Sequence, residues 1–249
     1  MYTNVNLAAP IGAMAFLGTG LLFFVAGLIF LYTVIKGELA GTKVVVGAVA
    51  VVAAMYIGFM VVFSFTSSET LLARGQEKHF CEIDCHLAYS ILDVRQTKAL
   101  GNGPNQSTAD GLYHIVTIKT RFDENTISST RGNSPLKPNT RVATLIDDQG
   151  RRYSPAANGQ SALLPAGSAN TPLTTPLRPG ETYTTTLVFD LPTNIQNPTL
   201  LLNEGEWLTR FVIGHENSPL HKKTRFQLWP ETRTSRCCDE QSSTAVSSN

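Results

Sequence analysis

One short phrase of this 249-residue chain gathers most of the side chains that could bind a metal or carry thiol chemistry. It reads EKHFCEIDCHLAYS and places His79, Cys81, Cys85 and His86 within eight positions. The whole chain holds only four cysteines and five histidines, so such a grouping is uncommon. Thiolates and imidazoles are ligands of copper and zinc, and paired thiols form disulfides in oxidising compartments.

Three interpretations of this phrase stay open. The first is a disulfide or redox pair of Cys81 and Cys85, which needs a turn because residues four apart in a straight strand lie roughly 13 Å apart. The second is a soft metal site for copper or zinc, in which Cys81 and Cys85 bind together with His86 or His79. The third is a pair of inert buried thiols that pack under a domain.

The phrase GHENSPLH, late in the chain, gives the metal interpretation its long-range support. It places His215 and His221 at the ends of predicted strands, and copper-binding β-sandwiches commonly take ligands from such a late loop. A single loop histidine is usually only solvated, so neither residue alone indicates a site. His114 lies on the apolar face of its strand and is predicted to be a hydrogen-bonded core residue. The remaining cysteines, Cys237 and Cys238, leave three pairings open.

Two uninterrupted apolar stretches open the chain and decide its class. Residues 11–35 and 44–65 contain no charged side chain, and each is long enough to cross ~30 Å of hydrocarbon as a helix. They predict a transmembrane helical hairpin over residues 1–66. The first stretch lacks a basic leader and exceeds the roughly 7–15 apolar residues of a signal peptide, so we expect it to remain as a helix.

The charges beside these stretches predict their orientation. Residues 1–10 carry none, whereas the connection between the stretches holds Lys36 and Lys43 against Glu38. Basic residues of short loops stay on the cytoplasmic side of a membrane. We therefore expect an integral inner (cell) membrane protein with its C-terminal domain on the extracytoplasmic side.

A stripe of small residues runs along the second stretch. Ala50, Ala54 and Gly58 recur every four residues, a spacing that allows helices to approach closely in lipid. We expect the stripe to pack the hairpin together, and a docking seam for another membrane subunit is the alternative. Neither stretch contains Asp, Glu, Lys, Arg or His, so nothing in them indicates a transport or proton path.

The rest of the chain is polar and strand-like. The helices and their connection contain two of the 20 basic and one of the 19 acidic residues, so 18 of each remain and no charge excess points to nucleic acid. We expect a membrane-proximal Cys/His segment at 67–86, a β-sandwich at 87–230 and a disordered, serine-rich tail at 231–249. About 165 residues precede that tail, enough for one domain with its own core.

Seven or eight strands are predicted in this region. Val116, Ile118 and Phe122 share one face of a strand over residues 113–123, an alternation typical of a strand buried on one side. Asp148-Gln149-Gly150 predicts a hairpin turn. The other predicted strands span residues 86–97, 141–147, 151–154, 182–191, 207–213 and 223–229. With no convincing soluble helix, the pattern predicts an Ig-like antiparallel β-sandwich.

Three phrases of this region, GLYHIVTIKTRFDENTIS, ATLIDDQGRRYSP and LRPGETYTTTLVFDLP, carry a resemblance. They resemble the immunoglobulin-like extracytoplasmic domains of bacterial membrane proteins and lipoproteins, a family of unknown function, over about residues 87–228. The matching positions are Asp147, Asp148, Gly150, Tyr153, Leu177, Pro179, Gly180, Glu181, residues 187–190 and Pro192. The resemblance implies the fold and says little about activity, because these positions are turns and core. The loop at 154–176 and the twin helices depart from the usual single lipid anchor.

Catalytic signatures are missing from the sequence. It contains no phosphate-cradling glycine loop, G-x-S-x-G elbow, H-E-x-x-H helix or calcium loop. We therefore expect a non-enzymatic, membrane-anchored accessory protein that needs no cofactor and presents its Ig-like domain to a protein partner. The alternative is a copper-handling or thiol-redox protein that uses Cys81, Cys85 and His86, with His79 and His221 as further ligands.

Overall fold

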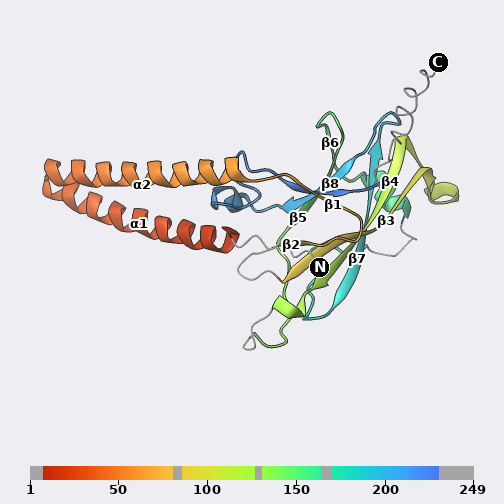
Figure 1. The fold of residues 1–249 in the computed structure, drawn as a ribbon, viewed down its shortest axis with the longest axis horizontal. Coiled ribbons are helices and arrows are strands. Elements are labelled where there is room, and N and C mark those ends of the chain that lie inside the picture. The colour runs from red at the N-terminus through yellow and green to blue at the C-terminus, as the bar shows by residue number, and fades with distance from the viewer. Residues whose placement is uncertain (1–7, 81–85, 127–130, 164–169, 230–249) are drawn as a thin grey trace, which may run out of the picture.

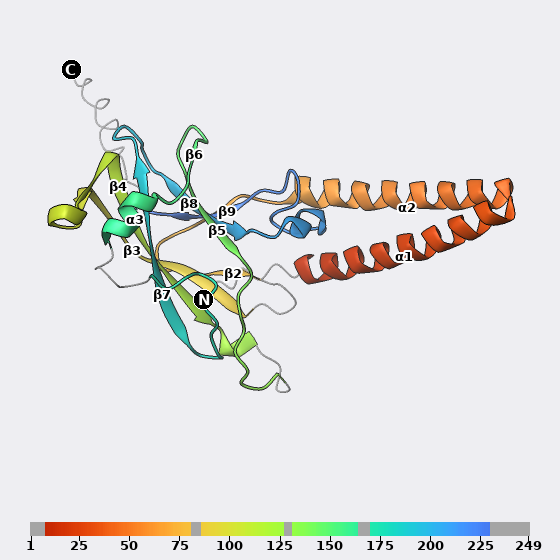
Figure 2. The ribbon, with the colours of Figure 1, turned by 180° about the vertical axis from the view of Figure 1, so that it is seen from behind.

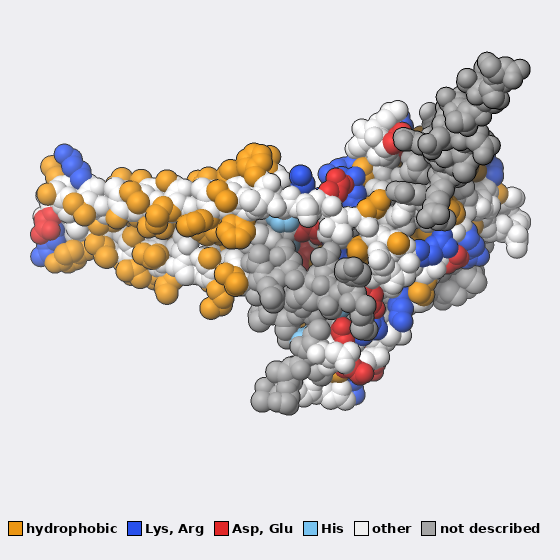
Figure 3. Space-filling view, in the orientation of Figure 1, with side chains coloured by type: hydrophobic (Ala, Val, Ile, Leu, Met, Phe, Trp, Pro, Cys, Tyr) orange, Lys and Arg blue, Asp and Glu red, His pale blue; other side chains and the backbone are white. Residues whose placement is uncertain are grey.

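A computed structural model describes residues 8–80, 86–126, 131–163 and 170–229. Two long helices, α1 (Ala8–Lys36) and α2 (Leu39–Thr66), extend from one end of a two-sheet β-sandwich (Figures 1 and 2). Both helices are long and apolar enough to cross a membrane, and their apolar stretches are not buried within the protein. Hydrophobic side chains cover the two rods, while charged side chains gather on the sandwich and at the far tip (Figure 3).

A tight turn joins the two helices. Gly37 adopts a left-handed backbone with φ of 72°, which glycine allows without strain. Its amide donates to the Val34 carbonyl at 3.0 Å, and the Glu38 amide donates to the Thr33 carbonyl at 2.9 Å. This pair of bonds is the Schellman motif, which ends α1 and satisfies its last carbonyls. The hydroxyls of Thr33 and Thr42 then bond across the turn at 3.1 Å.

Beyond the turn the helices diverge toward the sandwich (Figures 1 and 2). Ala50, Ala54 and Gly58 are exposed, and a Cβ added at Gly58 would meet no atom within 4 Å. The half-buried side of α2 instead includes Val45 and Val49. The prediction that the small-residue stripe packs the hairpin is therefore wrong, because a spacing of four identifies one face of a helix without saying which face meets the neighbour.

The larger sheet has the strand order β1-β9-β8-β5-β6. Its strands are β1 (Thr70–Leu72), β9 (Thr224–Gln227), β8 (Thr199–Glu204), β5 (Arg141–Ile146) and β6 (Arg152–Tyr153). β1 pairs with β9 in parallel, which corrects the prediction of a purely antiparallel sandwich; the other pairs of this sheet are antiparallel. Because β1 begins four residues after α2 ends, the chain passes from the helix directly into the edge of this sheet.

The smaller sheet has the order β2-β3-β4-β7 and is antiparallel throughout. Its strands are β2 (Lys78–Phe80), β3 (Leu87–Leu100), β4 (Ser107–Phe122) and β7 (Thr182–Leu191), with short 3-10 turns η1 (Gly103–Asn105) and η2 (Glu124–Thr126) beside β4. The alternation predicted along β4 is confirmed, since Val116, Ile118 and Phe122 are all buried. Residues 67–86 thus give one strand to each sheet.

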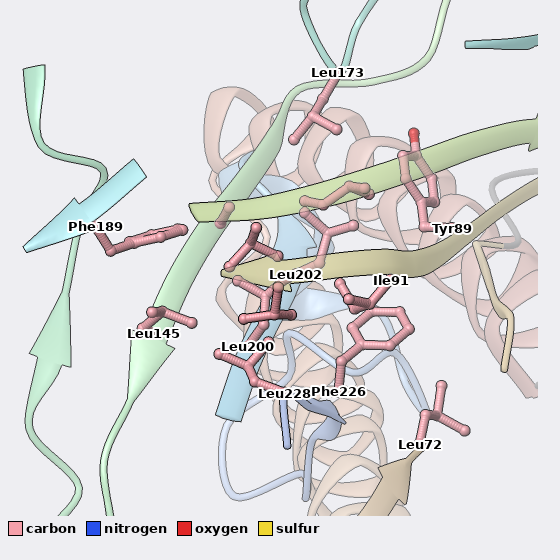
Figure 4. Packing of buried hydrophobic residues seen from close by; sticks show 14 of the residues in the cluster. Leu72, Tyr89, Ile91, Leu145, Leu173, Phe189, Leu200, Leu202, Phe226 and Leu228 are labelled. Carbon is pink, nitrogen blue, oxygen red and sulfur yellow. The ribbon is translucent and has the colours of Figure 1, made fainter. Parts of the chain in front are cut away.

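The two sheets bury one shared core (Figure 4). Side chains of the larger sheet meet those of the smaller sheet there, the former being Leu72, Leu145, Leu200, Leu202 and Phe226 and the latter Tyr89, Ile91 and Phe189. Alternate residues of each strand supply them, as expected for sheets with one buried face.

A short helix that the sequence did not indicate, α3 (Ala157–Leu163), covers part of the outer face of the smaller sheet. It packs near a second buried cluster of Ala109, Tyr113, Ile115 and Val188. A Cβ at Gly159 would lie 2.7 Å from the Val188 side chain, so the helix approaches the sheet closely. The Gln160 amide group bonds the Thr186 carbonyl at 2.9 Å and the Val188 amide at 3.1 Å, which satisfies the open edge of β7.

The strand predicted at 207–213 is wrong. Residues Trp207–Phe211 form a 3-10 helix, η3, in which the Thr209 amide donates to the Glu206 carbonyl at 3.3 Å. Its large apolar side chains are exposed instead of entering the core. β-prone residues predicted a strand here, but these side chains do not pack against the described core, so the extended form would gain no burial of apolar surface.

Candidate functional site

The four cysteines, Cys81, Cys85, Cys237 and Cys238, all lie outside the described residues. The Cys81–Cys85 disulfide and the thiolate metal site therefore stay predictions, and so does the disordered tail. Among the residues that the structure does describe, no three His, Cys, Asp or Glu side chains come together as a metal site.

The two histidines that flank the cysteines are both buried. His79, on β2, has its Nε2 3.7 Å from a carboxylate oxygen of Glu77. The Arg121 guanidinium donates two hydrogen bonds to Glu77, at 2.8 and 2.7 Å, and thereby lowers the pKa of that carboxyl. The ring of His86 stacks on Phe122 with centroids 5.2 Å apart. Protein groups therefore surround both imidazoles.

His221 lies in the chain that leads into β9 of the larger sheet, whereas His79 lies on β2 of the smaller sheet. Its Nδ1 is 2.7 Å from the Lys222 carbonyl oxygen, and burial lowers the pKa of its ring. The described contacts do not join His221 to either buried histidine. The prediction for His114 is confirmed: it is buried, its Nε2 lies 3.2 Å from the Gln96 amide nitrogen, and burial lowers its pKa to about 4.

A set of buried charges that sequence reasoning missed lies at the end of the sandwich nearest the helices. We call it the buried charge cluster: Lys78, Arg141 and Glu204 are buried, and His215 and Glu216 lie half-buried beside them. The Glu204 carboxylate lies between two basic side chains, with Arg141 Nη1 and His215 Nε2 each 3.3 Å from one of its oxygens. Lys78 Nζ lies 2.6 Å from Glu216 Oε2. The pairs made by His215 and Glu216 join strands β8 and β2 to the chain between β8 and β9, whereas Arg141 and Glu204 join β5 to β8.

Further contacts surround Lys78 and Arg141. Lys78 Nζ also donates to the carbonyls of Leu202 at 2.7 Å and Thr224 at 3.1 Å. The Phe80 ring lies 4.9 Å from Lys78 Nζ and 4.3 Å from the Arg141 guanidinium carbon. An aromatic face so close to both positive charges stabilises them where water is excluded.

Opposing effects set the protonation of this cluster. Burial alone would raise the pKa of the Glu204 carboxyl, but the His215 hydrogen bond and the Arg141 charge outweigh it and hold the pKa below its ordinary value. Burial lowers the pKa of the Lys78 ammonium, and Glu216 offsets that effect only in part. Pairing within the cluster therefore opposes the effect of burial on the pKa of both groups.

A sequence signal for these residues was available. Arg141 precedes Leu145 at an even spacing, and Glu204 follows Leu200 and Leu202 in the same way. In a strand, even spacing places side chains on the same face. A charge in register with core leucines therefore indicates a buried ion that needs a partner.

The chain between β8 and β9, residues 205–223, also contacts both helices; we call it the β8–β9 connection. The Tyr56 hydroxyl of α2 donates to the Phe211 carbonyl of η3 at 2.6 Å. At Gly12 of α1 an added Cβ would lie 1.8 Å from the Ile213 carbonyl oxygen, so only glycine permits this approach. The connection occupies the open end between the diverging helices (Figures 1 and 2).

A cavity of about 380 Å³ lies between the β8–β9 connection and the outer face of the larger sheet. Leu201 and Asn203 of β8 form its floor, and three basic residues, Arg152, Arg210 and Lys223, reach its lining. Guanidinium and ammonium groups in one concave site suit an anion such as a phosphate or carboxylate.

No protein-family model and no curated protein matches the sequence. Among solved structures, the chain is similar to MPT63, a secreted protein of Mycobacterium tuberculosis, with 14% identity, a TM-score of 0.40, and coverage of 65% of this chain and 99% of that one. It is also similar to a conserved hypothetical protein from Bacillus anthracis, with 16% identity, a TM-score of 0.39, and coverage of 53% and 89%. Neither likeness assigns a family or an activity.

The buried charge cluster yields a test by substitution of Glu204. We expect Glu204→Gln to lower the free energy of unfolding at neutral pH by about 3–5 kcal/mol, because Arg141 loses its buried counter-ion. Since the pKa of Glu204 is lowered in the folded state, its contribution is present above the ordinary value of 4.5 and is lost as the pH falls through the folded pKa. Urea denaturation of the detergent-solubilised chain across this range measures both effects.

A matched control is Arg95→Gln, which breaks an exposed pair with Asp93 at 3.1 Å. We expect it to change the free energy of unfolding by only about 0–1 kcal/mol at any pH. Equal losses of free energy of unfolding in the two variants would show that the buried pairing of Glu204 stabilises the fold no more than an exposed ion pair does.

Proposed function

We propose that this chain is a non-enzymatic accessory protein whose helices α1 and α2 cross a cell membrane and hold the β-sandwich in the extracytoplasmic space, where a protein partner binds it. The observation that carries this proposal is the joint between helices and sandwich. Phe211 is bonded to Tyr56 of α2, and Ile213 lies against Gly12 of α1. A domain supported on both rods keeps one orientation, as a presenting module requires.

The surface of the helices supports a lipid environment. Large apolar side chains point outward along both rods and are exposed, among them Leu21, Phe24, Leu31, Phe59 and Phe65. A continuous apolar surface of this size is unfavourable in water and matches the hydrocarbon of a bilayer. The joint at the sandwich end and the short turn at the other end suit two antiparallel spans.

The charges at the tip of the hairpin support the orientation. Lys36 and Lys43 lie on either side of the turn at Gly37, at the end of the rods away from the sandwich. Lysines in a short loop favour the cytoplasmic side. The sandwich at the opposite end then faces outward.

We also propose that the sandwich belongs to the Ig-like extracytoplasmic family whose phrases it resembles. The shared phrase around Asp147 acts as a turn: one carboxylate oxygen accepts the amides of Gln149 at 2.9 Å and Arg151 at 2.8 Å. Gly150 completes the turn with φ of 78°. The phrase therefore contributes structure, in agreement with a family that shares a fold more than an activity.

Reporter fusions test the topology. Alkaline phosphatase fused after Trp229 is expected to be active, because the enzyme needs the extracytoplasmic space to form its disulfides. The same enzyme inserted at Gly37 is expected to be inactive, whereas a cytoplasmic reporter there is active. The reverse pattern would contradict the proposed orientation.

The partner-binding role has its own test. Leu71 and Val142 lie exposed on the outer face of the larger sheet, and Leu92 is exposed on the smaller one. A photo-reactive residue is introduced at each of these three positions in turn, and at exposed Arg178 as the control. At a position that lies in the partner interface we expect a single discrete adduct in cells. If all three positions yield no adduct above that control, the role of a protein-binding module is contradicted.

The strand register favours a second candidate, the thiol-redox or copper-handling function. Phe80 of β2 pairs directly with Leu87 of β3, so the chain must reverse its direction between them. A Cys81–Cys85 disulfide needs such a reversal, because a straight strand would hold the two residues too far apart.

Peptide mapping of the full chain, purified without reductant, tests this candidate. We expect Cys81 linked to Cys85, and in Cys85→Ser we expect the Cys81 thiol to react with an alkylating reagent. Cys237→Ser is the matched control and should leave the Cys81–Cys85 link intact. Stoichiometric copper together with two reduced thiols would favour the metal site over the disulfide.

A further inference from the structure

The β8–β9 connection has an apolar side that the sandwich does not use. Its exposed side chains are Trp207 at 63%, Leu208 at 48%, Phe211 at 46% and Leu220 at 66% of full exposure. Trp207 and Phe211 pack edge to face, with ring centroids 5.9 Å apart, so they form one apolar surface. Clustered large apolar groups on a protein surface mark a place of interaction.

Two hydrogen bonds set the position of this connection along α2. Near the end of the helix, the Ser67 hydroxyl oxygen accepts the Lys222 amide at 2.9 Å. Eleven residues earlier, Tyr56 donates to the Phe211 carbonyl. At 1.5 Å per residue the two levels differ by roughly 16 Å. If α2 spans the membrane as proposed above, Lys222 lies at the surface and η3 lies at the depth of the outer acyl chains.

The backbone of η3 is suited to that depth. Lipid offers no hydrogen bonds, so polar backbone groups there need partners within the protein. Tyr56 satisfies the Phe211 carbonyl, and the Thr209 amide and hydroxyl both donate to the Glu206 carbonyl, at 3.3 and 2.5 Å. Asn217 donates to the Thr209 hydroxyl at 2.9 Å from the sandwich side. The Phe211 carbonyl and the polar groups of Thr209 thus have partners within the protein.

Behind the apolar surface lies the basic cavity. Among the described residues, no carboxylate comes within 4 Å of the charged groups of Arg152 or Arg210. Burial lowers the pKa of Lys223; the charge of Glu216 opposes this, while the charges of Lys78, Arg152 and Arg210 lower the pKa further. Three cations that repel one another in a cavity of about 380 Å³ would be stabilised by an anion.

The acids at this cavity do not neutralise it. Glu204 also reaches the lining, but Arg141 and His215 already engage its carboxylate. Glu206 lies exposed at the start of η3. The lining of the cavity therefore keeps an excess of positive charge.

We propose that the β8–β9 connection is a binding site for an anionic phospholipid. Trp207, Leu208 and Phe211 lie among the acyl chains, while the Arg210 side chain extends from η3 to the cavity that Arg152 and Lys223 also line, and these three residues bind the headgroup phosphate. Guanidinium groups bind phosphate oxygens in bidentate fashion, which makes arginine the suited residue. This inference rests on the proposed membrane crossing of α2.

Depth-dependent quenching tests the apolar half of the site. The chain has two tryptophans, so Trp229→Phe leaves Trp207 as the only reporter, and Trp207→Phe is the matched control that leaves Trp229. Both full-length variants are reconstituted in phosphatidylglycerol nanodiscs with brominated acyl chains. We expect strong quenching of Trp207 and weak quenching of Trp229. Equal quenching of the two would overturn the proposed depth.

Native mass spectrometry tests the headgroup half. The full chain, extracted in mild detergent, is offered equal amounts of phosphatidylglycerol and phosphatidylcholine, and we expect it to retain the anionic lipid. The double variant Arg152→Gln/Arg210→Gln is expected to bind that lipid at least about tenfold more weakly, since each charge-assisted bond is strong. Arg95→Gln/Arg178→Gln removes the same charge elsewhere and should retain the preference.

Further arms separate the sources of failure. If inorganic phosphate displaces the retained lipid and the chain shows no preference between the two lipids, the site binds free phosphate and the lipid assignment is overturned. A chain that floats with vesicles but shows neither Trp207 quenching nor lipid preference overturns this inference alone. A chain that does not float overturns the membrane crossing, and the lipid site with it.

Discussion

The hydrogen bond from the Tyr56 hydroxyl to the Phe211 carbonyl fixes how the sandwich stands on its helices. A tyrosine in the middle of an apolar helix needs a polar partner, and a backbone carbonyl at the outer end of a loop needs a donor. The Tyr56 hydroxyl and the Phe211 carbonyl therefore satisfy each other. Because Gly12 lets α1 approach Ile213, the β8–β9 connection contacts both rods, and these contacts link the sandwich to the helices.

The buried charge cluster carries this placement into the sandwich. The chain that leaves η3 reaches His215 and Glu216, which pair with Glu204 of β8 and Lys78 of β2. Buried ion pairs add little net stability compared with apolar side chains, but they are costly to break and accept few alternative partners. Their value here is geometric: they allow one position of the connection on the two sheets. A purely apolar contact would tolerate sliding, and the joint with the helices would then be lost.

Much of the fold followed from periodicity, and the errors have physical causes. The helices and β4 were predictable because burial on one side, or on none, leaves a clear pattern in the sequence. β1 and β2, with three residues each, are too short to show any period. The strand predicted at 207–213 was wrong because the β-prone side chains of this segment face away from the core, and composition alone does not show which way side chains face. In the buried charge cluster, the spacing of Arg141 and Glu204 from core leucines predicts that both side chains point inward. The pairing of Lys78 with Glu216 joins residues far apart in the chain and can be found only from the tertiary fold.

The strand β2, with which the Cys/His phrase begins, also contacts the β8–β9 connection. Lys78 and His79 are neighbours on β2, so their side chains point to opposite faces. Lys78 enters the buried charge cluster and bonds Glu216, while His79 lies beside Glu77 on the other face. The cysteine phrase therefore begins directly after the strand that holds the connection in place.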